Sequence, residues 1–158
     1  MQTTKRAART HGSQLTLAAL AALALTGFGP CWRIPGGELS GTEATGGVQD
    51  WSFVDAALDC QVEVRPADPY SFNAYCFNVG GALHLGCMRC ATKKWPTFVA
   101  ADPAVRVRFG ERIFPLRANR VTDAATLRAA WDDHWRKRKE GEPQPVPEDY
   151  WLFRLDPR

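Results

Sequence analysis

The sequence predicts a mainly β domain with two helical insertions, folded as a closed or nearly closed antiparallel barrel. Three observations support this class. Apolar residues alternate with polar ones through most of residues 60–121, which is typical of strands with one buried face. Loops that contain glycine or proline separate these segments at the short distances of hairpins. Only residues 123–141 show the pattern of a long amphipathic helix.

Three strands are expected in the first half of the domain, at residues 60–65, 71–79 and 82–86. In the first strand Cys60, Val62 and Val64 alternate with polar residues, which indicates one buried face. The second strand is apolar or aromatic on both faces, as in a more central strand. The loop PADPY (66–70) contains two prolines and an aspartate, so the first two strands are expected to form a hairpin.

A second group of strands is expected at residues 104–109, 112–121 and 150–155, after a short helix within residues 90–103. Valines and a phenylalanine alternate with Arg106 and Arg108 in the first of these strands. Gly110 can adopt the positive φ of a tight turn, which indicates a hairpin to the next strand. Pro115 has no N–H group, so that strand should have an edge or a bulge at this residue.

The amphipathic helix is expected to begin at Asp123, because aspartate is a favoured N-cap residue. One of its faces carries Leu127, Ala130, Trp131 and His134. Residues 136–139 are basic and would lie in the last turn, near the negative end of the helix dipole, and Gly141 would end the helix. We interpret His134 as a half-buried packing residue, not as a catalyst.

The N-terminal part of the chain has the composition of an export signal. Three basic residues within the first ten precede the uncharged run LTLAALAALALTGF, the order of regions in a signal peptide. The run is shorter than the roughly 20 apolar residues that cross a bilayer. We therefore expect residues 1–30 to be a signal peptide, residues 31–50 a flexible tether, and residues 51–158 the folded domain.

Cys31 follows the apolar run, in the sequence LTGFGPC. This resembles the lipobox of bacterial lipoproteins, although Phe28 and Pro30 stand where other residues are usual. The resemblance implies that Cys31 is lipidated and that a lipid anchor holds the protein on the extracytoplasmic side of a membrane of the bacterial cell envelope. A simple exported thiol, or one half of a disulfide, is the alternative for this cysteine.

The positive charge of the chain is local. The whole sequence has 20 basic and 17 acidic residues, and removal of the three basic residues of the expected signal leaves 17 of each. A neutral mature protein lacks the basic character of nucleic-acid-binding proteins, so we expect no nucleic-acid partner. Residues 89–120, however, contain eight basic and two acidic residues. Such a segment indicates either a solvated strand face or a site for an anionic ligand.

The expected domain contains Cys60, Cys76, Cys87 and Cys90. The spacing of the last two suits a redox dithiol, half of a metal site or a structural disulfide, and Ala91 replaces the histidine of a haem-attachment motif. Disulfides are expected in an exported protein. If PADPY forms a five-residue hairpin loop, Cys60 lies directly opposite Cys76 on the same face of the sheet. We therefore predict the pairs Cys60–Cys76 and Cys87–Cys90, and no metal site.

Three stretches carry a resemblance to a known superfamily: DWSF (50–53), KKWPTFVAADPAVRVRFGERIFPLRANRVTD (93–123) and WLFRLDP (151–157). They resemble the flavin-binding split-barrel superfamily, which includes pyridoxamine 5′-phosphate oxidase and the deazaflavin-dependent nitroreductases. The most specific part is a Lys-Trp-Pro step, a short helix that ends in ADP, and a Val/Arg strand followed by a longer one. The resemblance implies a split antiparallel β-barrel that commonly forms a homodimer and holds a cofactor in a groove between protomers.

The resemblance also implies candidate site residues. Basic residues near the third and fourth strands often hold the cofactor phosphate in this superfamily, which implies Lys93 and Lys94 at the start of a helical turn. Arg106 and Arg108, on the strand that follows, are further candidates for cofactor binding. Trp95 either covers an edge of the isoalloxazine ring or packs beneath the lysines. FMN is the expected cofactor, ahead of haem and of deazaflavin. The sequence lacks the glycine-rich basic loop of the deazaflavin enzymes, which argues against deazaflavin.

Two functions from different classes follow. The first is an exported FMN-dependent oxidoreductase of unknown substrate, in which the protein orients the cofactor. The second is a non-catalytic ligand-binding or structural lipoprotein that kept the barrel and lost the cofactor. The sequence offers no obvious proton donor, and we assign no catalytic residue.

Overall fold

The computed structural model describes residues 29–31, 33–48, 50–57, 59–138 and 141–158. Residues 1–28, where most of the export signal is expected, lie outside these ranges. Within them, no helix is long and apolar enough to span a bilayer. The elements in chain order are β1 (Thr42–Glu43), η2 (Ser52–Ala56), β2 (Asp59–Val64), β3 (Tyr70–Val79), β4 (Ala82–Cys87), η3 (Cys90–Thr92), α2 (Trp95–Ala101), β5 (Ala104–Phe109), β6 (Arg112–Val121), α3 (Ala124–Arg138) and β7 (Trp151–Pro157).

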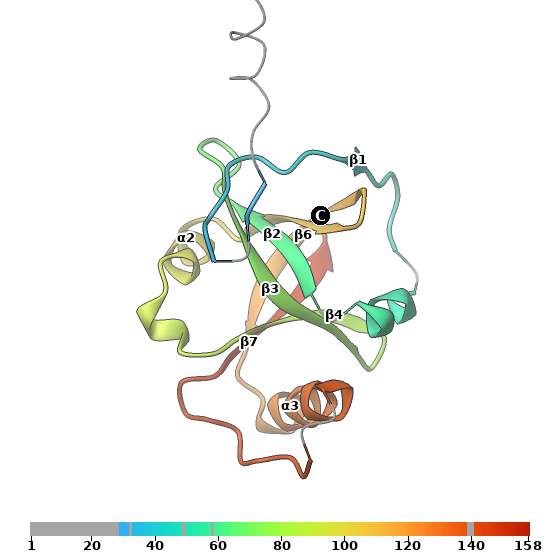
Figure 1. Ribbon diagram of the computed structural model, residues 1–158, viewed down its shortest axis with the longest axis vertical. Helices are drawn as coiled ribbons and strands as arrows, with labels where there is room; N and C mark the ends of the chain where they lie inside the picture. Colours follow the sequence, from blue (N-terminus) through green and yellow to red (C-terminus); the bar gives the residue numbers. More distant parts are fainter. Residues whose placement is uncertain (1–28, 32, 49, 58, 139–140) are drawn as a thin grey trace, which may run out of the picture.

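Six antiparallel strands form a closed barrel, in the order β6-β5-β2-β3-β4-β7, with β7 paired again to β6 (Figure 1). The helices lie outside it, α2 beside β2 and α3 against the outer face of β3. The predicted class, a mainly β antiparallel barrel with helical insertions, is therefore confirmed. The helix cap is also as expected, because the Asp123 carboxylate accepts a hydrogen bond of 2.7 Å from the Thr126 N–H.

Two long strands are each shared between two neighbours, and this splits the barrel. In β3, residues 70–75 pair with β2 and residues 75–79 pair with β4. In β6, residues 112–117 pair with β5 and residues 116–121 pair with β7. Pro115 lies in the part of β6 where β1 has ended and β7 has not begun. That side of the strand is an edge at Pro115, as predicted, so the missing N–H group of the proline leaves no neighbouring strand without a donor.

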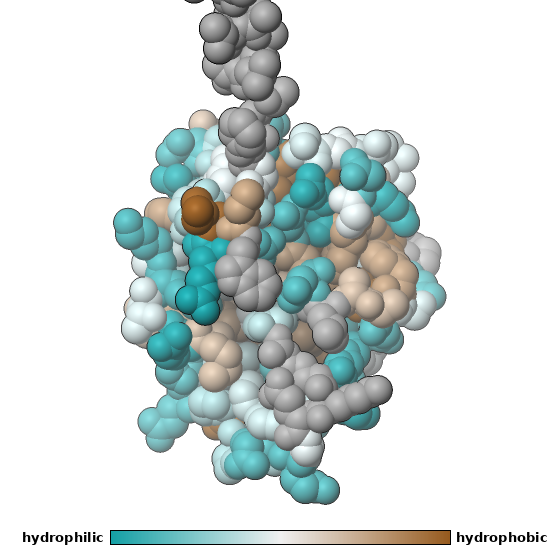
Figure 2. All heavy atoms as spheres, viewed as in Figure 1, coloured by the Kyte–Doolittle hydropathy of each residue, from teal (hydrophilic) through white to brown (hydrophobic). Residues whose placement is uncertain are grey.

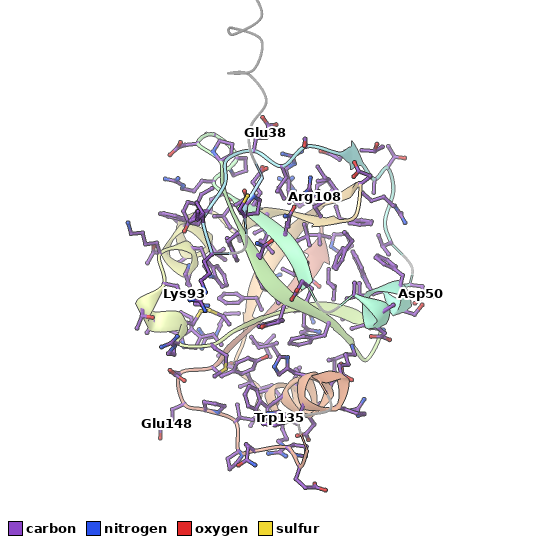
Figure 3. The ribbon with its side chains drawn as sticks, viewed as in Figure 1. Glu38, Asp50, Lys93, Arg108, Trp135 and Glu148 are labelled. Atoms are coloured by element: carbon purple, nitrogen blue, oxygen red, sulfur yellow. A yellow bond between two sulfur atoms is a disulfide. The ribbon has the colours of Figure 1, made fainter. Side chains whose placement is uncertain are left out.

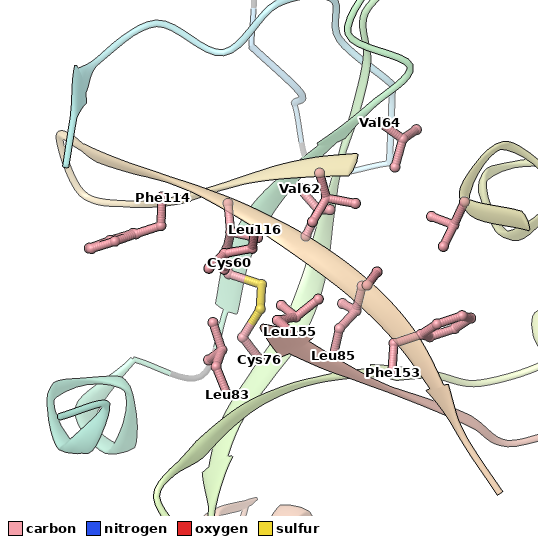
Figure 4. Close-up of a cluster of buried hydrophobic side chains, with 14 of the residues drawn as sticks. Cys60, Val62, Val64, Cys76, Leu83, Leu85, Phe114, Leu116, Phe153 and Leu155 are labelled. Atoms are coloured by element: carbon pink, nitrogen blue, oxygen red, sulfur yellow. A yellow bond between two sulfur atoms is a disulfide. The ribbon is translucent and has the colours of Figure 1, made fainter. Parts of the chain in front are cut away.

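The main core fills the barrel, and a second core lies under α3. Figure 4 shows the Cys60–Cys76 disulfide among the apolar side chains of the main core, close to Leu116 and Leu155. The second core joins the outer face of β3 and β7 to the helix through Phe77, Ala130, Trp131, Tyr150 and Leu152. Two layers of apolar side chains therefore stabilise β3, one on each of its faces.

The structure contains the disulfides Cys60–Cys76 and Cys87–Cys90, with Cα–Cα distances of 5.7 and 5.3 Å. These are the pairs expected from the sequence, but the register behind the first pair was wrong by two residues. Cys60 lies opposite Ala74, because Arg65 has a left-handed φ of 56° and the strand ends before it. A shift of two residues keeps Cys76 on the same face, so the two cysteines are diagonal neighbours.

Residues 33–44, here named the strap, lie across the outside of the barrel and do not form the free tether expected for residues 31–50 (Figure 1). Gly36 and Ser71 exchange two backbone hydrogen bonds of 2.9 Å, on the edge of β3 that β4 leaves open. Further along, β1 pairs in parallel with β6, and the Leu39 side chain is only 1% exposed. Backbone hydrogen bonds and one buried leucine hold the strap, so its attachment needs no apolar periodicity in the sequence.

A buried ion pair fastens the strap to the barrel. Glu63 on β2 is 2% exposed, and its carboxylate lies 2.9 Å from the guanidinium of Arg106, its register partner on β5. The same carboxylate accepts a hydrogen bond of 2.6 Å from the Leu39 N–H, and Arg108 donates one of 2.8 Å to the Ser40 carbonyl. Arg106 also donates a hydrogen bond of 3.4 Å to the Leu39 carbonyl, so both arginines of the Val/Arg strand bind the strap.

We predict that Glu63→Gln loosens the strap. Arg106 keeps the carboxylates of Glu38 and Glu43 at 3.6 and 3.8 Å, so the free energy of unfolding should fall by about 1.5–3 kcal/mol, the contribution of a hydrogen bond to a charged group. Hydrogen exchange should accelerate at the amides of Gly36 and Leu39. Glu111→Gln is the control, because this glutamate is exposed and makes no ion pair within the described residues. Unchanged exchange at Leu39 would show that the carboxylate does not hold the strap.

Candidate functional site

A groove of about 970 Å³ lies where β3 and β4 separate. Its wall on the barrel includes Asp59, Gln61, Tyr70, Phe72, Asn73, Ala74, Tyr75 and Gly86. The opposite walls come from the segment that leads into α2 and its first residue, with Arg89, Lys93, Lys94 and Trp95, and from the N-terminal segment, with Pro30, Arg33, Ile34 and Pro35. The groove exists because β4 joins β3 only from Tyr75 onwards, which leaves the first half of β3 open.

The visible face of the molecule is mostly hydrophilic, with smaller apolar areas beside the N-terminal segment and near η2 (Figure 2). Ile34 and Phe53 are the exposed large apolar side chains among the described residues, at 70% and 39% exposure. Ile34 belongs to the rim of the groove. The rim therefore combines one exposed aliphatic side chain with several cations.

The Cys87–Cys90 disulfide positions the cationic wall. It closes a tight turn between β4 and η3, and both of its cysteines are buried. Within this turn Arg89 has a left-handed φ of 49°, an uncommon conformation for a residue other than glycine. Backbone hydrogen bonds from Thr92 to Arg89 and from Lys93 to Cys90, each 3.1 Å, continue the turn into η3. The disulfide thus holds Arg89 and Lys93 on one short, constrained segment.

Three cations of this wall have no acidic partner in the described part of the chain: no ion pair involves Arg89, Lys93 or Lys94. Burial, and secondly the positive charge of Arg89, lower the pKa of Lys93. Like charges held close together without a counterion are unfavourable, and a bound anion would relieve that repulsion. The arrangement is therefore suited to an anionic group such as phosphate.

Trp95 packs within the protein. It is 5% exposed, and its ring stacks on Phe72 at a centroid distance of 4.8 Å and meets Phe153 at 5.2 Å. Neighbouring aromatic rings therefore occupy its faces, and a flat ligand in the groove can reach only an edge of Trp95. Of the two roles considered from the sequence, these contacts favour packing.

The start of α2 contributes less to anion binding than the sequence suggested. The helix begins at Trp95, with Lys94 as its N-cap residue and Pro96 in its first turn. Pro96 has no N–H group, and the Thr97 N–H already donates to the Lys94 carbonyl at 3.1 Å. The lysine and arginine side chains, rather than backbone N–H groups, are therefore the donors that this wall offers.

Arg106 and Arg108 do not line the groove, contrary to the sequence expectation. Figure 3 shows Arg108 near the strap and Lys93 beside the turn that leads into α2, at separate places on the molecule. Arg106 binds Glu63, and Arg108 binds the strap carbonyl of Ser40. The basic segment of residues 89–120 thus includes cations that hold the strap and other cations that line the groove.

Sequence reasoning missed Arg89 as a site residue, although it lies between the cysteines of the Cys-x-x-Cys motif. That motif was the available signal, because a disulfide over this spacing confines the residues between the cysteines to a tight turn. The polar and aromatic wall from Gln61, Tyr70, Asn73 and Tyr75 was also missed, because its members come from two strands read only as barrel. The described residues contain no group of three or more His, Cys, Asp or Glu able to hold a metal.

Neither the models of protein families nor the curated proteins match this chain. Several solved structures are similar. A conserved hypothetical protein of Mycobacterium tuberculosis has 14% identity and a TM-score of 0.56, and the match covers 74% of this chain and 86% of that one. Campylobacter jejuni ChuZ has 9% identity and a TM-score of 0.55, with 68% of this chain and 50% of that one covered. A putative pyridoxamine 5′-phosphate oxidase of Listeria innocua has 13% identity and a TM-score of 0.52, with 68% of this chain and 89% of that one covered.

We predict that Lys93 reacts with an amine-acylating reagent at a lower pH than an ordinary lysine, because its pKa is lowered. Arg89→Gln should move that pKa back up, since it removes one of the two causes. Lys137 is an internal control: burial lowers its pKa, but hydrogen bonds to Asp133 and Asp55 outweigh this and raise it, so it should react last. Labelling as a function of pH, read by mass spectrometry, measures both. Equal profiles for the two lysines would contradict the prediction.

The sequence identities of 9–14% to the three solved structures establish a likeness of fold and no more. In each case the likeness covers about two thirds of this chain or more. The chain has the split-barrel fold of the pyridoxamine 5′-phosphate oxidase-like proteins.

Proposed function

We propose that this protein binds FMN in the groove and acts as an FMN-dependent oxidoreductase. The observation that carries the proposal is the cluster of Arg89, Lys93 and Lys94, unpaired within the described residues, at the wall of a groove of about 970 Å³. Ligand sites commonly have volumes of about 300–1,000 Å³, so the groove is large enough for a cofactor. The similarity to a putative pyridoxamine 5′-phosphate oxidase of Listeria innocua supports the same reading.

The phosphate of FMN would bind the cationic wall. Arg89 offers a planar fork of N–H donors that matches two phosphate oxygens, and each lysine offers a compact charge. Binding there would replace the repulsion between Arg89 and Lys93 by attraction of both to the dianion.

The ring system of FMN would lie along the barrel wall. This wall combines the aromatic side chains of Tyr70, Phe72 and Tyr75 with Gly86, which has no side chain and lets a flat ring approach the backbone. The described residues that line the groove include no histidine, the commonest axial ligand of haem iron, which favours FMN over haem.

The division of labour would follow the general pattern of flavoproteins. FMN supplies the electron transfer when it is bound. The chain binds the phosphate, orients the ring and shields one side of it from water. The non-catalytic alternative differs only in the absence of turnover, so a bound FMN that no pyridine-nucleotide or chemical electron donor reduces at a useful rate would favour that alternative.

We predict that Lys93→Ala/Lys94→Ala binds FMN at least tenfold more weakly than the wild type. A hydrogen bond to a charged group contributes about 1.5–3 kcal/mol, and 1.4 kcal/mol corresponds to a factor of ten. Quenching of flavin fluorescence on titration measures the affinity. Arg117→Ala is the control, because it removes an exposed positive charge outside the groove. Equal affinity in the double variant, or no binding by the wild type, would refute the proposal.

We further propose that Cys31 carries the lipid anchor implied by its sequence context. This cysteine is exposed and outside both disulfides. The strap begins two residues later and is bound to the barrel, so an acyl chain on Cys31 would hold the groove close to the lipid surface.

Replacement of Cys31 by serine should move the protein from the membrane to the soluble fraction of the cell envelope. The serine side chain cannot form the thioether, and the barrel would keep its fold because Cys31 is exposed. Fractionation after expression of both forms is the measurement. A wild type that is already soluble, or a variant that stays in the membrane, would exclude the anchor.

A further inference from the structure

The groove has more positive charge than one phosphate group can neutralise. Among the described residues that line it, four are cationic and one is acidic, namely Arg33, Arg89, Lys93 and Lys94 against Asp59. A phosphate monoester carries about two negative charges at neutral pH. With FMN bound as proposed, the lining residues would therefore keep about one positive charge without a counterion. Uncompensated like charges in a groove are unfavourable, which favours a second anionic group in the same site.

Arg33 is the cation that the phosphate would leave without a partner. Arg89, Lys93 and Lys94 lie together in the segment that leads into α2, whereas Arg33 comes from the N-terminal segment. Besides burial, the cause of the lowered pKa of Lys93 is the charge of Arg89 and not that of Arg33. Within the described residues, no ion pair involves Arg33. Its guanidinium is therefore separate from the cationic wall and can take another anion.

Hydrogen bonds fix the turn that carries Arg33. Cys31 and Ile34 exchange two backbone hydrogen bonds, at 3.1 and 2.6 Å, which close the turn. Before the turn, the Gln61 side chain of β2 donates a hydrogen bond of 3.3 Å to the Pro30 carbonyl. After the turn, the strap pairs with β3. Contacts with the barrel thus flank Arg33 on both sides in the chain, so its backbone is held at the groove.

The surroundings of Arg33 on this wall are apolar. Pro30, Ile34 and Pro35 line the groove with it, and the Ile34 side chain is 70% exposed. An exposed aliphatic side chain beside an unpaired guanidinium suits a molecule with an apolar body and one acidic group. A guanidinium can bind a carboxylate through two parallel hydrogen bonds. A carboxylate also supplies the single negative charge that the groove lacks once a phosphate is bound.

We propose that Arg33 binds the carboxylate of an apolar organic acid, and that such acids are the substrate class of the FMN-loaded groove. This rests on the proposed function and extends it. The FMN phosphate would occupy the cationic wall, the carboxylate of the acid would bind Arg33, and its apolar part would contact Ile34. Arg33 would then determine specificity, because it selects acids over neutral molecules of the same shape.

Benzoate and benzamide test this on the FMN-loaded protein, because they have nearly the same size and shape and only benzoate is charged. Hydrocinnamate and its amide form a second, longer pair of probes. Calorimetric titration measures each affinity. In at least one pair the acid should bind about tenfold more tightly than the amide, since a hydrogen bond to a charged group is among the stronger ones.

Arg33→Gln should remove this preference by weakening the acid about tenfold, and should leave the affinities for the amide and for FMN unchanged. Arg33→Lys keeps the charge and loses the planar fork, so it should retain part of the preference. The fold should tolerate both changes, because Arg33 is exposed. Arg117→Gln is the control: it removes an exposed positive charge outside the groove and should change none of these affinities.

Three outcomes would overturn the inference and leave the proposed function in place. The first is no preference for the acid in either pair, and the second is an unchanged preference in Arg33→Gln. The third is a loss of FMN affinity in Arg33→Gln as large as in Lys93→Ala/Lys94→Ala, which would make Arg33 part of the phosphate site. Absence of FMN binding by the wild type would overturn the proposed function and this inference together.

Discussion

The architecture depends on one constraint, the sharing of β3 and β6 between two neighbours each. The barrel closes because these two ten-residue strands each change partner part-way along. In β3 the change occurs at Tyr75, and the first half of the strand is left with an open edge. Unpaired backbone edges attract other chain segments, and here the strap binds at Ser71 while the groove occupies the rest. The same constraint therefore creates the groove and the seat of the strap.

The two disulfides act on different parts of this arrangement. Cys60–Cys76 lies in the main core and joins β2 to the half of β3 that pairs with β4, across the point of partner change. Cys87–Cys90 stabilises a turn that would otherwise be unfavourable, because it contains a left-handed arginine whose charge is repelled by the nearby Lys93. Local features that destabilise a fold gather at functional sites more often than elsewhere, which agrees with the groove as the site.

Charge in the sequence was a reliable guide to the region of interest and a poor guide to the role of each residue. Residues 89–120 are strongly basic, but Arg106 is used internally, by a glutamate 43 positions earlier in the chain. Lys93, in the same segment, lines the groove without an acidic partner in the described chain. The difference arises because alternation on β5 turns Arg106 to the outer face, where Glu63 of β2 lies directly opposite.

The sequence by itself determined the mainly β class, the positions of the strands and of the long helix, and the choice of cysteine pairs, because alternation, turn residues and spacing are local properties. Even the register error of two residues left Cys76 on the correct face, since the side-chain period of a strand is two. Only the tertiary structure decided which cations are free and where the strap lies. Those facts depend on contacts between residues far apart in the chain, and no local pattern encodes which strand edge stays open or which charge finds a partner across it.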